Sequence, residues 1–196
     1  MNAATASFAG LELVTSPLVM TPRETSAGLV ACAADHLGGG PGVVVDVGTG
    51  SGAIALAVAK AAPHAAVWAT DVSAAAVELT RLNARRAGLD NRVAVRQGSL
   101  LDPFPGRADV IVANLPYLPL GERRTYPELA SEPVSAVFAE GDGLGLVRRL
   151  VGAARRRLTP DGLLALQVRG RIHAARRPDL HVLEHLLAPQ PAAAAA

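Results

Sequence analysis

Cysteine, lysine and aromatic residues are scarce in this chain of 196 residues. Cys32 is the single cysteine, which excludes an internal disulfide and a cysteine-based metal cluster and predicts a cytoplasmic protein. No apolar run approaches the roughly 18 residues that a membrane-spanning helix needs, so we expect no membrane partner. The first residues also lack the basic start and apolar block of a signal peptide.

Apolar residues are abundant, whereas charged residues are few. Half of the residues are hydrophobic and 18% are charged, which suits one domain with a sizeable core and excludes disorder over most of the length. The formal net charge is +2, but nine arginines lie between Arg148 and Arg177, where Asp161 is the one acidic residue. This block predicts either a solvated face or a surface for nucleic acid or an acidic protein.

Short apolar runs alternate with helical patterns along the chain, which predicts an α/β fold with a doubly wound, mostly parallel sheet. The expected strands cover 43–47, 67–70, 93–95, 110–113 and 163–168. The expected helices cover 21–37, with Thr21 as its cap and Glu24 completing a capping box, then 53–62, 73–88 and 146–158. A turn at Pro160-Asp161-Gly162 should precede the fifth strand, and 181–187 fits either a strand or a helical turn.

A glycine-rich turn directly follows the first expected strand. It runs from Asp46 through Gly48, Thr49 and Gly50 to Gly52, and its glycines allow a tight turn and close approach to a ligand. Asp71 ends the next strand, where a carboxylate can bind both hydroxyls of a ribose. The negative charge of Asp46 suits the ammonium group of a methionine moiety and would repel a pyrophosphate. This charge favours S-adenosylmethionine over NAD as the cofactor.

The tetrapeptide Asn114-Leu115-Pro116-Tyr117 follows the fourth expected strand and should open onto the same edge of the sheet. The Asn114 side-chain oxygen and the Leu115 carbonyl can accept both hydrogens of a planar NH2 group. Pro116 restrains the backbone, and Tyr117 offers a flat face against that group. Two acceptors localise the nitrogen lone pair, so alignment and electrostatics can supply most of the catalysis of N-methylation. The alternative reading of the tetrapeptide is an ordinary turn.

At these residues the chain resembles the HemK-type protein-glutamine methyltransferases, class I enzymes that use S-adenosylmethionine to modify peptide-chain release factors. The glycine turn resembles motif I, and the tetrapeptide resembles Asn-Pro-Pro-Tyr with Leu115 replacing the first proline. Flanking elements of the family are matched at 8–13, 22–25, 132–133 and 141–144. The resemblance implies a Rossmann-like core, catalysis by Asn114, Leu115, Pro116 and Tyr117, and cofactor binding by Asp46, Gly48, Thr49, Gly50, Gly52, Asp71, Val72, Ser99, Leu100 and Asn114.

The resemblance covers about residues 8–168 and includes two departures. We expect no counterpart of the N-terminal helical domain with which bacterial members grip the release factor. The fifth strand ends Gln167-Val168-Arg169, where the family has Glu-Ile-Gly. We expect an entry segment and capping helix over 1–40, the cofactor-binding core over 41–170, and an atypical tail with a disordered end over 171–196. Because this tail is short, the closing strands should be incomplete and leave an apolar edge for a partner to cover.

Three functions stay open at this point. The first is methylation of a glutamine amide in a protein such as a release factor. The second is methylation of an rRNA or DNA amine, with the arginines of 148–177 holding phosphates, since Asn-Leu-Pro-Tyr also occurs in ribosomal RNA adenine methyltransferases. The third is a paralogue that binds the cofactor but has lost catalysis. The histidines show no metal-ligand spacing, so we expect no metal, and the oligomeric state stays open.

Overall fold

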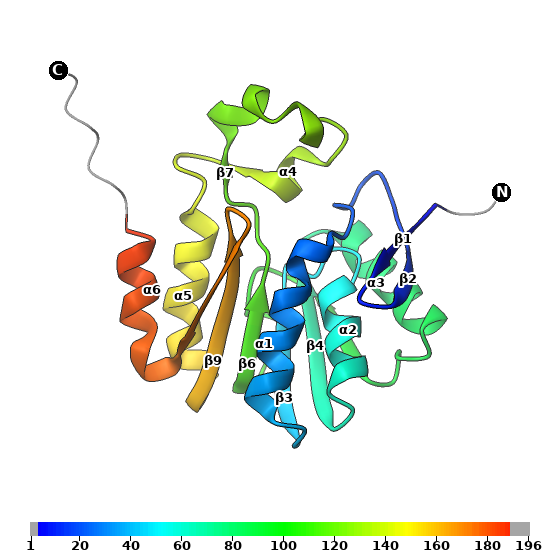
Figure 1. Cartoon of the computed structure of the whole chain (residues 1–196), viewed down its shortest axis with the longest axis vertical. Helices are drawn as coiled ribbons and strands as arrows, with labels where there is room; N and C mark the ends of the chain where they lie inside the picture. Colours follow the sequence, from blue (N-terminus) through cyan, green and yellow to red (C-terminus); the bar gives the residue numbers. More distant parts are fainter. Residues whose placement is uncertain (1–3, 189–196) are drawn as a thin grey trace.

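The computed structural model describes residues 4–188, and a six-stranded sheet forms its centre (Figure 1). The strands are β3 (Gly42–Val47), β4 (Ala65–Asp71), β5 (Val93–Gln97), β6 (Ala108–Ala113), β9 (Leu158–Val168) and β10 (Arg171–Arg176). Their order across the sheet is β10-β9-β6-β3-β4-β5, and β10 alone runs antiparallel to its neighbour. The carboxyl ends of the parallel strands therefore meet at one edge of the sheet.

Helices cover both faces of this sheet. One face packs against α1 (Ala27–Leu37), α2 (Ala53–Ala61) and α3 (Ala74–Arg86), and the other against α5 (Gly145–Arg157) and α6 (Leu180–Leu186). Because side chains alternate along a strand, Val44 joins the core of the first face and Val45 that of the second, and both are fully buried. The predicted doubly wound α/β architecture is confirmed.

Two smaller parts lie near the carboxyl edge. One is the entry hairpin of β1 (Thr5–Phe8) and β2 (Leu11–Val14). The other, which we call the insertion, spans 118–144 and stands above the sheet in Figure 1. It contains β7 (Leu118–Pro119), η2 (Leu120–Thr125), η3 (Pro127–Leu129), α4 (Val134–Val137) and β8 (Phe138–Ala139). Its own apolar cluster includes Leu129 and Phe138. Neither part is among the elements that the sequence predicts.

Three local predictions differ from the structure. The helix expected from Thr21 begins instead with a short 3-10 turn, η1 (Glu24–Ser26). Glu24 Oε1 accepts from the Ala9 N–H at 3.1 Å and makes no capping box. The expected turn at 160–162 lies inside β9, where the register with β6 shifts. The ambiguous segment 181–187 lies almost entirely in α6.

The sheet closes on β10, a single antiparallel strand after β9. The expectation of an exposed apolar edge is wrong, because Arg171 and Arg176 are exposed on β10 and α6 packs against this strand. The expected disordered end of the tail, 189–196, lies outside the described residues. Within residues 4–188, no helix combines the length and the apolar character needed to cross a bilayer.

Candidate functional site

A cavity of about 430 Å³ opens at the carboxyl ends of β3, β4, β5 and β6. Its size falls within the range of small-molecule sites. The parallel topology brings the glycine turn, the end of β4, the turn after β5 and the tetrapeptide after β6 to this one place. Ten residues predicted from the sequence line it: Gly48, Thr49, Gly50, Asp71, Val72, Ser99, Leu100, Asn114, Leu115 and Pro116.

Three predicted site residues lie outside this lining. Asp46 is completely buried below the glycine turn. Gly52 is the residue before α2, with φ of +84°, and a Cβ there would lie 2.9 Å from the Thr80 side chain. Tyr117 packs among residues of two core clusters. These three residues adjoin elements that line the cavity but do not line it themselves, and their predicted roles in binding and catalysis stay predictions.

Hydrogen bonds fix the glycine turn against the end of β4. The N–H groups of Gly48 and Thr49 both donate to the Thr70 carbonyl, at 2.8 and 3.0 Å. The Gly50 N–H donates to Asp71 Oδ2 at 3.0 Å. Gly48 and Gly50 have φ of +75° and +59°, which favours glycine at both positions. The Asp71 carboxylate still has lone pairs free to accept from ligand hydroxyls.

Asp46 carries a buried carboxyl group with one unused oxygen. Its Oδ2 accepts from Thr49 Oγ1 at 2.7 Å and from the Ala55 N–H at 3.1 Å. Its Oδ1 is buried without a hydrogen-bond partner among the described residues. Burial raises the pKa of Asp46 to about 7, although the two hydrogen bonds oppose this rise. A cation bound nearby would favour the charged form of this carboxyl.

The raised pKa of Asp46 predicts a particular pH dependence of stability. Between its unfolded value of 3.8 and its folded value of about 7, the folded state holds a proton that the unfolded state has lost. The free energy of unfolding should therefore fall as pH rises through this window, by roughly 4 kcal/mol in total. Asp46→Asn should remove this component, as measured by urea unfolding across the same pH range. Parallel pH curves for wild type and variant would contradict the assignment.

Thr70 and Leu100 shape the wall next to the turn after β5. Leu100 has φ of +48°, an unusual value for leucine, and its carbonyl accepts from Thr70 Oγ1 at 2.8 Å. Thr70 thus holds the glycine turn with its carbonyl and this second turn with its hydroxyl. It is missing from the predicted site, although its place directly before Asp71 could have indicated it.

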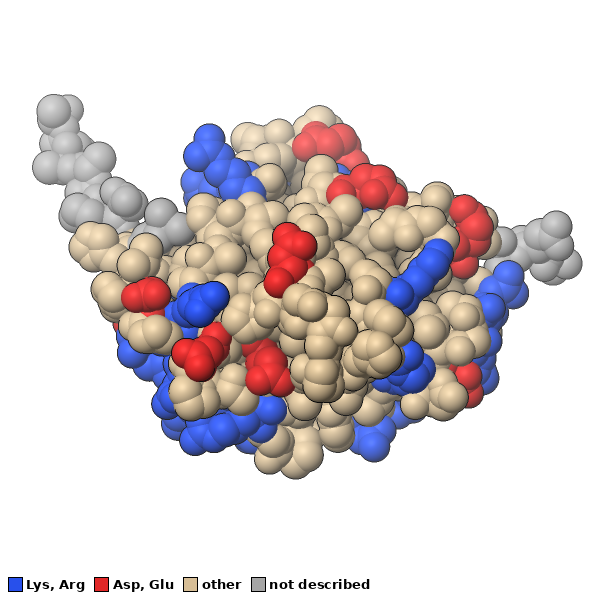
Figure 2. Space-filling model, turned by 60° about the horizontal axis from the view of Figure 1, so that its bottom comes forward, with Lys and Arg blue, Asp and Glu red and all other residues tan. Residues whose placement is uncertain are grey.

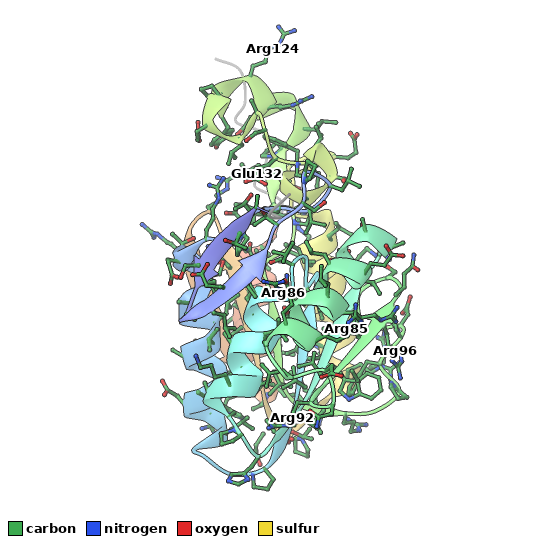
Figure 3. The ribbon with its side chains drawn as sticks, turned by 90° about the vertical axis from the view of Figure 1, so that its right-hand side faces the viewer. Arg85, Arg86, Arg92, Arg96, Arg124 and Glu132 are labelled. Carbon is green, nitrogen blue, oxygen red and sulfur yellow. The ribbon has the colours of Figure 1, made fainter. Side chains whose placement is uncertain are left out.

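Glu132 of the insertion fastens the segment that follows the entry hairpin. Its Oε2 accepts from the Thr21 N–H at 3.0 Å, and its Oε1 lies 3.6 Å from the Arg23 guanidinium. Figure 3 shows Glu132 at the base of the insertion. Because Thr21 and Arg23 line the cavity, this contact joins the insertion to the cavity wall. The resemblance marks Glu132-Pro133 as a family element, and the structure supplies a physical reason for it.

Gly143 holds the tetrapeptide in place through close backbone contact. A Cβ at Gly143 would lie 2.8 Å from the Leu118 carbonyl carbon and still closer to the Tyr117 carbonyl oxygen. The backbone at Gly143 also has φ of +83°, which disfavours other residues. Only glycine therefore lets the start of α5 approach the segment that carries Asn114.

Gly143→Ala should lower turnover by roughly a hundredfold, because a displacement of about 1 Å in a reacting group can cost this much. Gly141→Ala is a matched control, since Gly141 has φ of +64° but a Cβ there would meet nothing within 4 Å. Initial rates of methyl transfer and melting temperatures of both variants would be compared. Equal losses of rate in the two variants would argue for backbone strain alone.

The Asn114 side chain is half-buried at the cavity and has a polar neighbour that the sequence did not predict. Its Nδ2 donates to Ser26 Oγ at 3.1 Å, and Ser26 also lines the cavity. Ser26 lies in η1, 88 residues earlier in the chain. No local spacing could have linked these two residues.

The arginine block at 148–177 is partly engaged within the fold. Arg148 pairs with Asp142, and Arg155 pairs with Glu184 at 2.9 Å. Figure 2 shows Lys and Arg in separate groups with Asp and Glu between them on the visible face. Two of the nine arginines of the block are engaged in ion pairs, and the prediction that the block binds nucleic acid stays a prediction.

A second cavity, of about 550 Å³, lies along the edge strand β5 and α3. We call it the arginine groove, because its lining includes Arg81, Arg85, Arg92 and Arg96. Figure 3 shows Arg85, Arg92 and Arg96 on this side of the molecule. Arg81 and Arg96 donate to the Val95 carbonyl, each at 3.1 Å. Within residues 4–188, no carboxylate lies within ion-pairing distance of these arginines.

Comparison with known proteins finds methyltransferases. The family model for the methyltransferase small domain matches residues 25–127. A release factor glutamine methyltransferase from Gloeobacter violaceus is 43% identical over 168 residues, which are 84% of this chain and 59% of that protein. A ribosomal protein uL3 glutamine methyltransferase from Burkholderia pseudomallei is 39% identical over 136 residues, or 65% of this chain and 44% of that protein. This chain thus spans less than two thirds of either relative.

A solved structure adds evidence on the fold. The 16S rRNA methyltransferase of T. thermophilus, solved with AdoMet and guanosine, superposes with a TM-score of 0.60. It is 22% identical, and the match covers 84% of this chain and 41% of that chain. The likeness confirms the predicted Rossmann-like fold of the class I methyltransferases.

Proposed function

Because this chain belongs to the HemK-type family of protein-glutamine methyltransferases, we propose that it methylates the side-chain amide of a glutamine in a protein such as a release factor. One observation carries the proposal: Asn114 lines the same cavity as Gly48 and Asp71. The acceptor group and the methyl donor would therefore meet in one crevice. The names of two relatives, which act on a release factor and on a ribosomal protein, support a protein substrate.

The residues around the cavity fit S-adenosylmethionine. The unpartnered Oδ1 of Asp46 lies behind the glycine turn, and a cationic ligand would favour the charged form of this carboxyl, whereas a pyrophosphate would disfavour it. Asp71 ends β4 with lone pairs available for two ribose hydroxyls. Val72, which is 73% exposed, and Leu100 offer apolar surface for the adenine. When bound, this cofactor supplies an electrophilic methyl group on a sulfonium.

The tetrapeptide would orient the acceptor amide. The Asn114 Oδ1 and the Leu115 carbonyl each accept one N–H of the glutamine amide, which localises the nitrogen lone pair. Bound S-adenosylmethionine would supply the methyl group, and the amide nitrogen that receives it would release one N–H proton to solvent water, because this proton becomes acidic as the nitrogen gains positive charge. No ionised base is needed before transfer, so positioning and electrostatics provide the catalysis.

The proposal is tested with a labelled methyl donor and two substrates, a purified release factor and a cell extract. Label that survives nuclease digestion, is lost on protease digestion and maps to a glutamine side chain is the expected result. Label lost on nuclease digestion would favour a nucleic-acid acceptor. Binding of the donor without any transfer would favour a catalytically impaired paralogue.

A second candidate is methylation of an amine in rRNA or DNA. The arginine groove supports it, since its guanidinium groups have no carboxylate partners within 4–188 and could hold phosphates. The engaged arginines of 148–177 support it less. Affinity for single-stranded RNA that falls steeply with salt, and falls further when Arg85 and Arg96 become glutamine, would favour this candidate.

A further inference from the structure

A chain of hydrogen bonds runs from Asn114 into the core. Asn114 Nδ2 donates to Ser26 Oγ at 3.1 Å, and Ser26 Oγ donates to Gln167 Oε1 at 2.6 Å. Gln167 Nε2 in turn donates to Thr25 Oγ1 at 3.3 Å. Ser26 and Gln167 are 5% and 3% exposed, so water competes little for these bonds. The chain joins the end of β6, the start of α1 and the end of β9.

The direction of each bond in this chain is set by Gln167. A serine hydroxyl has one proton, and Ser26 gives it to the Gln167 carbonyl oxygen. The oxygen of Ser26 can then only accept from Asn114, which turns the Nδ2 of the carboxamide toward Ser26. Asn114 Oδ1 makes no hydrogen bond within the described residues, so it is the atom left to accept from a substrate amide.

We propose that Gln167 is a positioning residue for methyl transfer, which sets through Ser26 which atom of the Asn114 carboxamide faces the acceptor. This inference rests on the proposed function. Gln167 is not part of the cavity lining and therefore acts only through its neighbours. An apolar residue at 167 would free the Ser26 proton to donate to Asn114 Oδ1. The carboxamide would then flip and present two N–H donors to an acceptor that itself carries N–H groups.

The departure from the family at this position fits the same role. The resemblance places glutamate where this chain has Gln167, and both side chains have an oxygen that accepts the Ser26 proton. Residue 167 needs only a side-chain oxygen that accepts the hydrogen bond from Ser26, and the negative charge of a glutamate is not needed. Gln167→Glu should therefore preserve the direction of the hydrogen bonds from Asn114 to Ser26 and from Ser26 to residue 167. Gln167→Met has a similar size but cannot accept the Ser26 proton in this way, so these directions should be lost.

The test compares these two variants by steady-state kinetics. We expect Gln167→Met to lower kcat by about tenfold or more with little change in cofactor affinity, and Gln167→Glu to stay within about threefold of wild type. In a protein that already carries Ser26→Ala, adding Gln167→Met should not lower kcat further, because the hydrogen bonds that join Gln167 to Asn114 are already lost. Equal losses in both variants, or additive losses with Ser26→Ala, would overturn the proposal.

A second readout does not depend on activity. The side-chain amide signals of Asn114 in an NMR spectrum can be assigned by their absence in Asn114→Ala. They should shift in Gln167→Met and stay in place in Gln167→Glu. Thr159→Val is the matched control for stability, since Thr159 Oγ1 bonds to Asp109 Oδ1 at 3.1 Å near the other end of β9. Unchanged Asn114 signals in Gln167→Met would refute the proposed role of Gln167 in orienting the Asn114 carboxamide. Absent turnover in the wild-type protein would refute only the proposed function.

Discussion

Replacing Asn114 with alanine should lower kcat for methyl transfer by roughly a hundredfold to a thousandfold, with the dissociation constant of S-adenosylmethionine changing less than about threefold. The carboxamide lines the cavity beside the tetrapeptide backbone, and within residues 4–188 its Oδ1 accepts no hydrogen bond. Its loss removes one of two acceptors that align the amide nitrogen, whereas the glycine turn and Asp71, to which we assign most of the cofactor binding, stay in place. Initial rates with saturating substrate and calorimetric titration of the cofactor would measure the two quantities.

Asn91→Ala is the control for this variant. Asn91 is exposed and lies near the arginine groove, at a different edge of the sheet. It should leave both rate and affinity unchanged. If Asn114→Ala lost cofactor affinity and turnover by the same factor, Asn114 would have a structural role in the crevice. The proposed acceptor site would then have to be abandoned.

The sequence predicts those parts of the site in which the residues at the end of a single strand are enough to indicate both the strand and the turn after it. Four of the five residues of 43–47 are valines and glycines follow them, so both the strand and the turn after it could be predicted. Parallel strands end at a common edge, and that rule alone brings Asp71 and Asn114 beside Gly48. The fold class and most of the cavity lining follow from these local patterns.

The entry hairpin escaped prediction because its turn lacks the usual residues. A two-residue hairpin turn of type I′ needs positive φ at both positions, and Asn-Gly is its common signature. Here Ala9 and Gly10 take φ of +47° and +72°, and alanine gives no hint of that conformation. The strands themselves have only four residues each, too few for a clear alternation.

The other features that the sequence did not predict depend on the burial of side chains and on contacts between residues far apart in the sequence. Asp46 was expected beside the ligand from its charge, but the fold buries it completely and binds it to Thr49. Ser26 and Gln167 are 141 residues apart, and only the packing of α1 against β9 brings them together. Such contacts depend on tertiary structure, which no motif spacing encodes.

Replacing Asp71 with alanine should have the opposite signature to Asn114→Ala. The dissociation constant of S-adenosylmethionine should rise by roughly a hundredfold, since two hydrogen bonds to a charged acceptor are lost. Within the protein, Asp71 Oδ2 also accepts from the Gly50 N–H, and Oδ1 accepts from the Ser73 N–H at 2.9 Å. The glycine turn should therefore loosen as well. At saturating cofactor, kcat should stay within about threefold of wild type, because the acceptor site is intact.

Two further variants separate ribose binding from loop anchoring. Asp71→Asn keeps the side-chain shape and one oxygen acceptor, so its affinity should lie between those of wild type and Asp71→Ala. Asp90→Ala removes an exposed carboxylate that lines the arginine groove, away from the cofactor cavity, and should leave cofactor affinity unchanged. Competition with 2′- and 3′-deoxyribose analogues supplies the decisive comparison, since each missing hydroxyl should weaken binding to wild type but not to Asp71→Ala. Equal weakening in both proteins would show that the ribose is held elsewhere.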